Sequence, residues 1–594
     1  MDANKRGERV GLVRLNLKKL KTIKPWNGVF LSFLICAIAA YIACIISANN
    51  IIFNADSFAA IHQAQLVTGG STFDSRELRF ARIPSIFPDL ATLLVFTKLE
   101  PAKIHIIIAN NSWLFATLFI FLQSEFGYLT CSKRASRIVV ATLSSFTTLL
   151  LLKCSNGFQE AFGILISPVH HGGNVINSLL LGCLILWEIN SLGQNPSKNH
   201  GILKTLLLSL TVFLGFTSNK LIFFTGVIPY IATSMIVCHK KSERQASRVT
   251  GAQTFDRSWR LLIILFASTA ALIILGIINN QCSFAMKLEV VHAWGQIFSI
   301  VLAEPLYLIL ISCLLITTLI SVKTQFSRIL SLGSLSSTIS ISAKKDTAAI
   351  AGLVFTLLFT LSTFTYTALI SDSSVIPIRY ILPLYTGASL SLLILASLSL
   401  MRLRLAICSN LTHKNKYLLL AIASIPLATL SFLTVPSIFT SRNYLIWRQF
   451  SHAFQAKTSD TKPIILYLNS KGLSNGLSDF WGTELADAGY LYSEISSKIS
   501  IEPIKYDGSP YLWSHSKKQF FDQTKPLSLK PYNFIISKDP VFMEKLKNTL
   551  GPMKIVNLSN GFQLVIFDKS NEQLHPFIKQ TLQKGLSKSQ VECI

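Results

Sequence analysis

Long apolar stretches, separated by short polar connections, run through most of this sequence. A hydrocarbon core about 30 Å thick needs about 20 mostly apolar residues per helix, and eleven stretches approach that length. They are 27–48, 105–126, 138–153, 174–189, 203–218, 221–238, 260–280, 295–321, 347–370, 380–401 and 417–436. Half of the 594 residues are hydrophobic and only 14% are charged. The sequence therefore predicts a multi-spanning α-helical membrane protein with about eleven transmembrane helices.

The distribution of lysine and arginine predicts how these helices are oriented. Basic residues near the ends of spans are retained on the cytoplasmic side. The tail 1–26 is strongly basic, and every second connection after it is rich in lysine and arginine, whereas the connections between them hold few. We therefore expect the N-terminus to be cytoplasmic and the chain after residue 436 to lie outside the membrane on the opposite side. The expected membrane is the cell membrane, namely the inner membrane of a bacterium.

The net charge of +26 is accounted for mainly by these topology-determining residues. They are spread over several connections and do not gather on one soluble face. The expected partner of the basic residues is thus the lipid bilayer, and we expect no nucleic acid partner.

The sequence changes character after the last predicted span. Residues 437–594 contain short apolar runs between polar, glycine and proline turns, which is typical of strands. The expected strands are 463–468, 499–504, 533–537, 554–557 and 562–567, and helical spacing occurs in 478–491 and 541–550. This pattern predicts a small extracytoplasmic α/β domain that follows the transmembrane module 27–436.

The first outward connection, residues 49–104, is the longest in the predicted transmembrane module, and a loop of this length between helices is usually functional. It contains Asp56, Arg82 and Asp89 among its charged residues. The other outward connections carry further polar residues that face the same compartment. These are Glu160, His170, His171, Lys220, Arg379 and Tyr380.

Four features together resemble a known family. They are Asp56 soon after the first span, the long first loop, the run Arg379–Tyr385 (Arg-Tyr-Ile-Leu-Pro-Leu-Tyr) at the start of a late span, and the C-terminal α/β domain. The chain is similar in these respects to the GT-C glycosyltransferases, of the mannosyltransferase and aminoarabinose-transferase type. The resemblance implies an integral membrane enzyme that moves a sugar from a polyprenyl-phosphate donor to an extracytoplasmic acceptor, such as a lipid or a cell-envelope glycan.

The resemblance also implies roles for individual residues. In the family, an acidic residue in the first outward loop takes the proton of the acceptor hydroxyl, and Asp56 matches that position; a carboxylate within hydrogen-bond reach can do this chemistry. The alternative is that Asp56 caps a following helix. The phosphate of the leaving carrier needs cationic partners, for which Arg379 is the first candidate and Lys220 and Arg82 the next. The alternative for all three is snorkelling to lipid headgroups.

The remaining candidates are assigned to substrate binding. His170 and His171 are adjacent, so their side chains point in different directions and do not by themselves form a two-ligand metal site. Glu160 is a second carboxylate or a solvated loop charge, and Asp89 contacts substrate or orders its loop. No cofactor is required by this chemistry; a divalent metal ion is compatible with it, but no cysteine and histidine spacing supports one.

Two other classes of protein remain as alternatives. A transporter or flippase of a lipid-linked sugar typically has internal repeats and ionisable residues within its spans. No clear repeat is found here, and Glu304 is the main ionisable residue inside a predicted span. A non-catalytic envelope assembly protein, in which the outward domain is the working part, is the other alternative.

Overall fold

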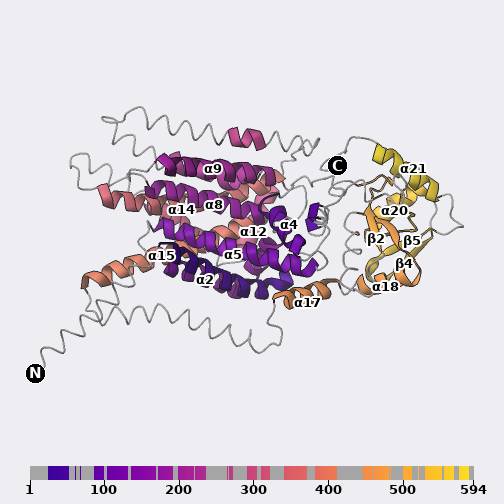
Figure 1. Ribbon diagram of the computed structural model, residues 1–594, viewed down its shortest axis with the longest axis horizontal. Helices are drawn as coiled ribbons and strands as arrows, with labels where there is room; N and C mark the ends of the chain where they lie inside the picture. Colours follow the sequence, from indigo (N-terminus) through magenta and orange to yellow (C-terminus); the bar gives the residue numbers. More distant parts are fainter. Residues whose placement is uncertain are drawn as a thin grey trace, which may run out of the picture.

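The structure is a computed structural model. It describes residues 25–51, 86–99, 104–131, 136–168, 172–191, 198–219, 221–235, 290–303, 309–321, 340–370, 381–410, 446–458, 461–479, 499–511, 529–551, 554–567 and 574–587, with a few single positions and one short stretch between these ranges. Figure 1 shows a bundle of helices lying side by side, with an α/β unit at one end.

Six helices in the described part of the chain are long and apolar enough to cross a membrane. They are α2 (Pro25–Ser47), α5 (Ile104–Thr130), α6 (Arg137–Cys154), α8 (Gly172–Ser191), α14 (Ser340–Ile370) and α15 (Leu382–Asn410). Each coincides with a predicted span. The chain is therefore a multi-pass membrane protein by the length and composition of these helices, and its orientation remains a prediction.

The other five predicted spans are matched less fully. Shorter apolar helices cover Ile202–Ser218, which belongs to α9 (Lys198–Ser218), and also Phe223–Met235 and Ile309–Ser321. The predicted span 295–321 begins within α12 (Val290–Ala303), which ends before the helix at Ile309 starts. The predicted span 260–280 is described only in part, and 417–436 lies outside the described residues. The total of eleven spans thus stays a prediction.

Aromatic side chains and glycines build the centre of the bundle. Phe126 of α5 and Phe355 of α14 are fully buried, with ring centroids 5.6 Å apart. Gly182 of α8 faces both rings, and a Cβ atom there would lie 2.7 Å from Phe126. Because tightly packed cores tolerate extra volume poorly, the absence of a side chain at Gly182 is what lets three helices meet at this level.

The connection between α6 and α8 folds back onto the end of α2. It contains α7 (Asn156–Ile166), whose first turn is capped by the Ser155 hydroxyl, which accepts from the Phe158 amide at 3.0 Å. The Gln159 side chain donates to the carbonyl of Ile46 at 2.9 Å. Gly163 lies directly against η1 (Ala48–Asn50), the 3₁₀ turn after α2. This end of the bundle, where α2 ends and α8 begins, is called the domain-side end below.

Helix α17 (Ile446–Thr458) connects the bundle to the α/β unit at the domain-side end (Figure 1). Ile446, Phe450 and Ala453 recur at helical spacing and are buried in the bundle core. The backbone amide of Ile446 donates to the Tyr41 hydroxyl at 3.1 Å, and the Trp447 indole donates to Asn110 at 2.9 Å. The apolar face and these two hydrogen bonds fix α17 to α2 and α5.

The α/β unit contains a five-stranded sheet with the order β2-β1-β3-β5-β4. The strands are β1 (Asn475–Ser478), β2 (Ser500–Pro503), β3 (Phe534–Ser537), β4 (Ile555–Asn557) and β5 (Gln563–Ile566). β1 pairs in parallel with β2 and β3, whereas β5 is antiparallel to β3 and β4. Alternate residues face opposite sides of a strand. Accordingly, Ile535 and Val565 pack with α20 (Pro540–Leu550) and α21 (Leu574–Ser587), and Phe534 and Leu564 pack with α18 (Lys462–Ser470).

Most of the predicted elements in this unit are confirmed, and one is wrong. The strands expected at 499–504, 533–537, 554–557 and 562–567 correspond to β2, β3, β4 and β5, and the helix expected at 541–550 is α20. The run 463–468 is helical, not a strand: it lies in α18, which begins with a proline in its first turn and buries Ile464 and Leu468 four residues apart. The predicted helix 478–491 lies mostly outside the described residues, and its first residue, Ser478, ends β1.

Candidate functional site

The predicted site residues divide into two groups. Asp89 and Glu160 are described by the structure. The other seven lie outside the described residues, namely Asp56, Arg82, His170, His171, Lys220, Arg379 and Tyr380. For these, the structure describes only the neighbouring residues and the elements to which those neighbours belong.

These neighbouring residues lie at the domain-side end of the bundle. Ile51 follows η1, and Gly172 begins α8 directly after the two histidines. Asn219 and Leu221, on either side of position 220, are buried, and the Asn219 side chain accepts from the Leu221 amide at 3.0 Å. Ile381 precedes α15, which contacts α7. The chain thus brings the flanks of widely separated outward connections to one end of the molecule.

Asp89 is the acidic residue that the structure places within this end. It belongs to η3 (Ile86–Leu90), a short helical segment in the first loop before α4 (Ala91–Leu99), and its side chain is 2% exposed. A Cβ atom on Gly173 would lie 2.2 Å from the Asp89 Oδ2 atom. The carboxylate therefore rests against the first turn of α8, where the free backbone amides and the helix dipole favour negative charge.

A set of polar groups, most of them buried, makes hydrogen bonds in and around this segment, and we call it the η3 polar cluster. Its members are Phe87 (through its backbone), Asp89, Thr92, Asn111, Asn177 and Ser218. The Phe87 amide donates to the Ser218 hydroxyl at 2.5 Å, and the Asn177 side chain donates to the Phe87 carbonyl at 3.1 Å. The Thr92 hydroxyl interacts with the Asp89 carbonyl at 2.9 Å and with Asn111 Oδ1 at 2.5 Å. Segments from the first loop, α5, α8 and α9 therefore meet in one polar contact region.

A second group of hydrogen bonds fastens the segment after α9 to α8. The Thr225 hydroxyl, in η4 (Phe223–Val227), lies 2.9 Å from the Ser178 hydroxyl and accepts from the Asn174 side chain at 3.1 Å. All three residues are buried. These contacts hold η4 next to the first two turns of α8, close in sequence to Asn177 of the η3 polar cluster.

Glu160 is placed differently. It lies on α7 and is exposed, one residue after Gln159, which binds the end of α2. It is at the domain-side end but is not a member of the η3 polar cluster. Asp89 and Glu160 thus share an end of the bundle, one buried against α8 and the other facing outward.

Four members of the η3 polar cluster were not predicted from the sequence: Thr92, Asn111, Asn177 and Ser218. Each lies in or beside an apolar helix, where a single amide or hydroxyl is common and carries little information. A usable signal existed, because Asn174 and Asn177 recur three residues apart at the start of a span, and Asn110 and Asn111 occur in the first two turns of another. Polar residues inside membrane helices are costly unless they are partnered or functional.

The described residues contain no group of three histidine, cysteine, aspartate or glutamate side chains that could hold a metal ion. The expectation that no metal is required remains a prediction, because most of the acidic and histidine candidates lie outside the described residues.

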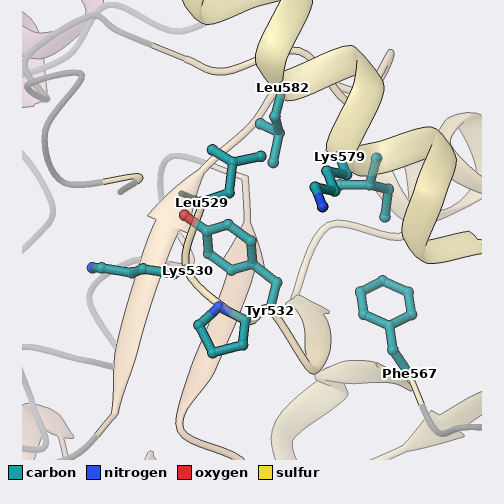
Figure 2. A pocket seen from close by; sticks show the side chains of 8 residues that line it. Leu529, Lys530, Tyr532, Phe567, Lys579 and Leu582 are labelled. Carbon is teal, nitrogen blue, oxygen red and sulfur yellow. The ribbon is translucent and has the colours of Figure 1, made fainter. Parts of the chain in front are cut away.

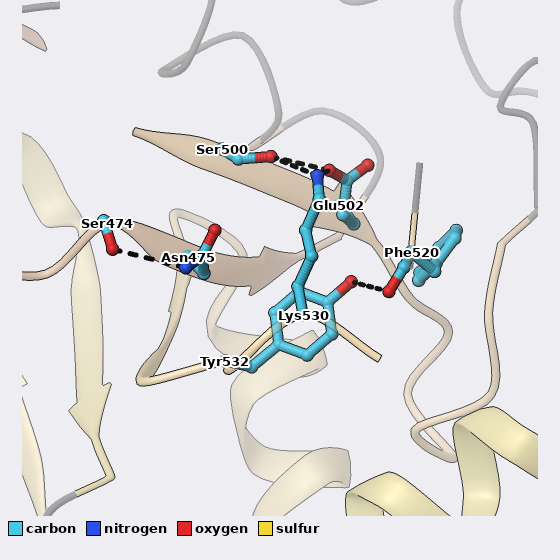
Figure 3. A network of polar contacts seen from close by, with 7 residues as sticks. All are labelled: Ser474, Asn475, Ser500, Glu502, Phe520, Lys530 and Tyr532. Atoms are coloured by element: carbon cyan, nitrogen blue, oxygen red, sulfur yellow. Dashed lines mark hydrogen bonds and ion pairs between the residues drawn. The ribbon is translucent and has the colours of Figure 1, made fainter. Parts of the chain in front are cut away.

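The α/β unit has its own buried charges. Lys530 Nζ lies 2.6 Å from Glu502 Oε1 and donates to the Ser500 hydroxyl at 2.7 Å, as Figure 3 shows. Glu502 is 5% exposed. Tyr532 donates to the Phe520 carbonyl at 3.3 Å, and burial, followed by the nearby charge of Glu502, raises the pKa of Tyr532 well above its ordinary value of 10.0. This network joins β2 to the segment before β3.

A cavity of about 230 Å³ lies between that segment and α21 (Figure 2). Its walls are mainly apolar, with Leu529, Tyr532, Phe567, Ile578 and Leu582 among them. Lys530 also lines it, but its ammonium group is committed to Glu502. The cavity therefore offers apolar contact and the ammonium of Lys579, and none of the described residues that line it carries the carboxylate that the predicted chemistry needs.

The described residues define a multi-pass helical membrane protein with an α/β unit at one end. No protein-family model and no curated protein matches the chain. Among solved structures, it is similar to two crystal structures of ArnT from Cupriavidus metallidurans, one bound to undecaprenyl phosphate and one in the apo state. The matches cover 91% and 92% of this chain and 98% and 99% of those chains, with 11% and 12% sequence identity and a TM-score of 0.42 in both cases. Similarity at this level does not carry function from one protein to the other.

Proposed function

We propose that this protein is a membrane glycosyltransferase that moves a sugar from a polyprenyl-phosphate carrier to an acceptor at the domain-side end of the bundle. The observation that carries the proposal is that residues flanking the predicted site positions lie at the domain-side end of the bundle, where the carboxylate of Asp89 is buried against α8. The acceptor is a lipid or a cell-envelope glycan, and the working compartment is extracytoplasmic.

The chemistry divides among the predicted residues by charge. Asp56 takes the proton of the acceptor hydroxyl as the new glycosidic bond forms, because a carboxylate is a suitable general base for this step. Arg379, Lys220 and Arg82 bind the phosphate that leaves with the carrier. His170, His171, Tyr380 and Glu160 contact the sugar or the acceptor. Asp89 is the acid held against α8, and we assign it to substrate binding near the sugar.

The contacts at the other end of the bundle bear on the transport alternative. The ion pair between Arg137 and Glu125, at 3.1 Å, joins the last turns of α5 to the first residue of α6. Arg137 also lies 4.6 Å from the centre of the Tyr128 ring, and Glu188, near the end of α8, accepts from Tyr230 at 3.1 Å. In the described spans, these charged residues lie near helix ends and are engaged by neighbours. They do not form the series of mid-span ionisable groups that a transport path typically uses.

The decisive experiment measures sugar transfer by purified protein from labelled polyprenyl-phosphate sugars to a panel of lipid and glycan acceptors. Loss of a general base lowers the rate by about 10² to 10⁴-fold, so we expect Asp56→Asn to reduce transfer by at least about 10²-fold. Asp74→Asn is the matched control, because it makes the same change elsewhere in the first loop and should leave the rate nearly unaltered.

Two outcomes would contradict the proposal at different levels. Full activity of Asp56→Asn removes Asp56 as the base. If the wild-type protein transfers no sugar from any donor but supports movement of a lipid-linked sugar across vesicle membranes, then the protein is a transporter. Undecaprenyl phosphate is a suitable first probe for carrier binding.

A further inference from the structure

In each of two buried side-chain amides of the η3 polar cluster, one polar atom makes a hydrogen bond and the other does not. Asn177 donates through Nδ2 to the Phe87 carbonyl, while its Oδ1 atom has no hydrogen-bond partner among the described residues. Asn111 accepts through Oδ1 from Thr92, while its Nδ2 atom likewise has none. Their side chains are 1% and 0% exposed. A buried polar atom without a partner is costly, so these two atoms mark a place where a polar group is missing.

The two unpaired atoms are complementary in kind. Asn177 Oδ1 is an acceptor, and Asn111 Nδ2 is a donor. A hydroxyl group can donate a hydrogen bond to the first atom and accept one from the second. Both amides are bonded to the same short stretch, because Asn177 donates to the Phe87 carbonyl and Asn111 Oδ1 accepts from the Thr92 hydroxyl. The single proton of that hydroxyl goes to Asn111 Oδ1 at 2.5 Å, which is nearer than the Asp89 carbonyl at 2.9 Å. Both unpaired atoms therefore belong to residues that are fastened to the same stretch, 87–92.

The charge of the cluster indicates which part of the donor belongs there. Asp89 is buried in the same segment and rests on Gly173 of α8. A buried carboxylate repels an anion at short distance, since charge interactions are strong where water is excluded. The carrier phosphate is therefore disfavoured, whereas a sugar hydroxyl, which is neutral and can also donate to a carboxylate, is favoured.

We propose that Asn111 and Asn177 form a subsite for a hydroxyl group on the sugar ring of the donor, with Asp89 excluding the carrier phosphate from it. The inference rests on the proposed glycosyltransferase function and adds to it the recognition of the sugar. The competing occupant is a buried water molecule, which also donates and accepts and commonly bridges buried polar groups.

The first experiment needs no variant. The affinity of the wild-type protein is measured for undecaprenyl phosphate, for an undecaprenyl-phosphate hexose, and for the series of monodeoxy forms of that hexose. We expect the complete sugar to bind about tenfold more tightly than the form that lacks the recognised hydroxyl, a ratio that corresponds to about 1.4 kcal/mol. Equal binding of the whole deoxy series overturns the subsite, and points to water as the occupant.

The second experiment uses Asn111→Leu and Asn177→Leu, which remove the unpaired atoms and keep a side chain of similar size. Both variants should bind the complete and deoxy sugars equally, while their affinity for undecaprenyl phosphate stays the same as that of the wild type. Asn174→Leu is the matched control, because Asn174 is one turn away on α8, is buried, and has both amide atoms bonded to Thr225.

The outcomes separate the two proposals. The subsite is overturned if Asn111→Leu and Asn177→Leu keep the tenfold preference for the complete sugar over the deoxy form. It is also overturned if Asn174→Leu loses this preference as well. Neither result affects the conclusion that the protein binds the carrier. Failure of the wild-type protein to bind any carrier overturns the proposed function, and the subsite with it. Size-exclusion profiles confirm that each variant is folded, and the deoxy series on the wild type decides the matter if a variant is not.

Discussion

Substituting Gly173 with alanine tests whether η3 rests directly on α8. A Cβ atom at this position would lie 2.2 Å from Asp89 Oδ2 and 2.7 Å from Pro88 Cδ. Non-bonded heavy atoms prefer a separation of about 3.5–4.0 Å, so η3 has to move by about 1 Å. Overpacking of this kind typically costs about 1–3 kcal/mol, whereas replacing a glycine by alanine inside a helix gains about 1 kcal/mol. The net expectation is a destabilisation of up to about 2 kcal/mol.

Gly28→Ala is the matched control for this prediction. Gly28 lies in α2, and nothing lies within 4 Å of a Cβ atom built there. The control therefore keeps the helix-propensity gain of up to about 1 kcal/mol without the clash. Thermal unfolding in detergent, followed by tryptophan fluorescence, should place Gly173→Ala below and Gly28→Ala at or above the wild type.

The same variant has a consequence for activity. A displacement of about 1 Å at a substrate-positioning element can reduce the rate by about 10²-fold, so Gly173→Ala should lose sugar transfer while it remains folded. Equal thermal stability and equal transfer rates for Gly173→Ala and Gly28→Ala would show that η3 does not pack on α8 as described, and would refute the reasoning.

The remaining predictions concern the α/β unit. Lys530→Met leaves Glu502 buried without its partner, and we expect it to destabilise this unit by about 3 kcal/mol. This value is the lower end of the range for a broken buried pair, because Lys530 is partly exposed. Chemical denaturation measures the loss, and the double variant Lys530→Met/Glu502→Leu should recover much of it. The raised pKa of Tyr532 favours its neutral form in the folded state, so its contribution to stability is complete below about pH 10 and is lost as the pH rises through the folded-state pKa. Tyr532→Phe should therefore weaken the loss of stability above pH 10, and an unchanged alkaline profile would assign that loss to other groups.

The long helices were predictable because twenty consecutive apolar residues have few alternatives in a membrane, and α2, α5, α6, α8, α14 and α15 follow that pattern. The short elements of the α/β unit were less predictable from the sequence. In 463–468 five hydrophobic residues within six fit a strand or a buried helix equally well, and Pro463 is compatible with the first turn of α18. β1 was missed because Leu477 is the one large apolar residue in its four, and its burial comes from the neighbouring strands.

The location of the candidate site stays a prediction for the seven residues outside the described ranges, and its buried parts were not predicted from the sequence. Charged residues in outward loops stand out in an apolar chain, and hence Asp89 was selected. Whether an asparagine in a helix faces lipid, another helix or a polar cluster depends on tertiary packing, so the paired asparagines at the starts of α5 and α8 indicate polar contacts but do not identify their partners. Only the contacts of η3 with α5 and α8 reveal which atoms of these two amides remain unpaired.

The two adjacent asparagines of α5 link the site to the α/β unit. Asn110 accepts from Trp447 of α17, and Asn111 accepts from Thr92 at the start of α4. Successive residues of a helix project about 100° apart, so α5 lies between the helix that leads to the α/β unit and the segment that carries Asp89. A change in the position of α17 therefore reaches the η3 polar cluster through one turn of α5. We therefore expect the α/β unit to brace the first loop through α17 and α5.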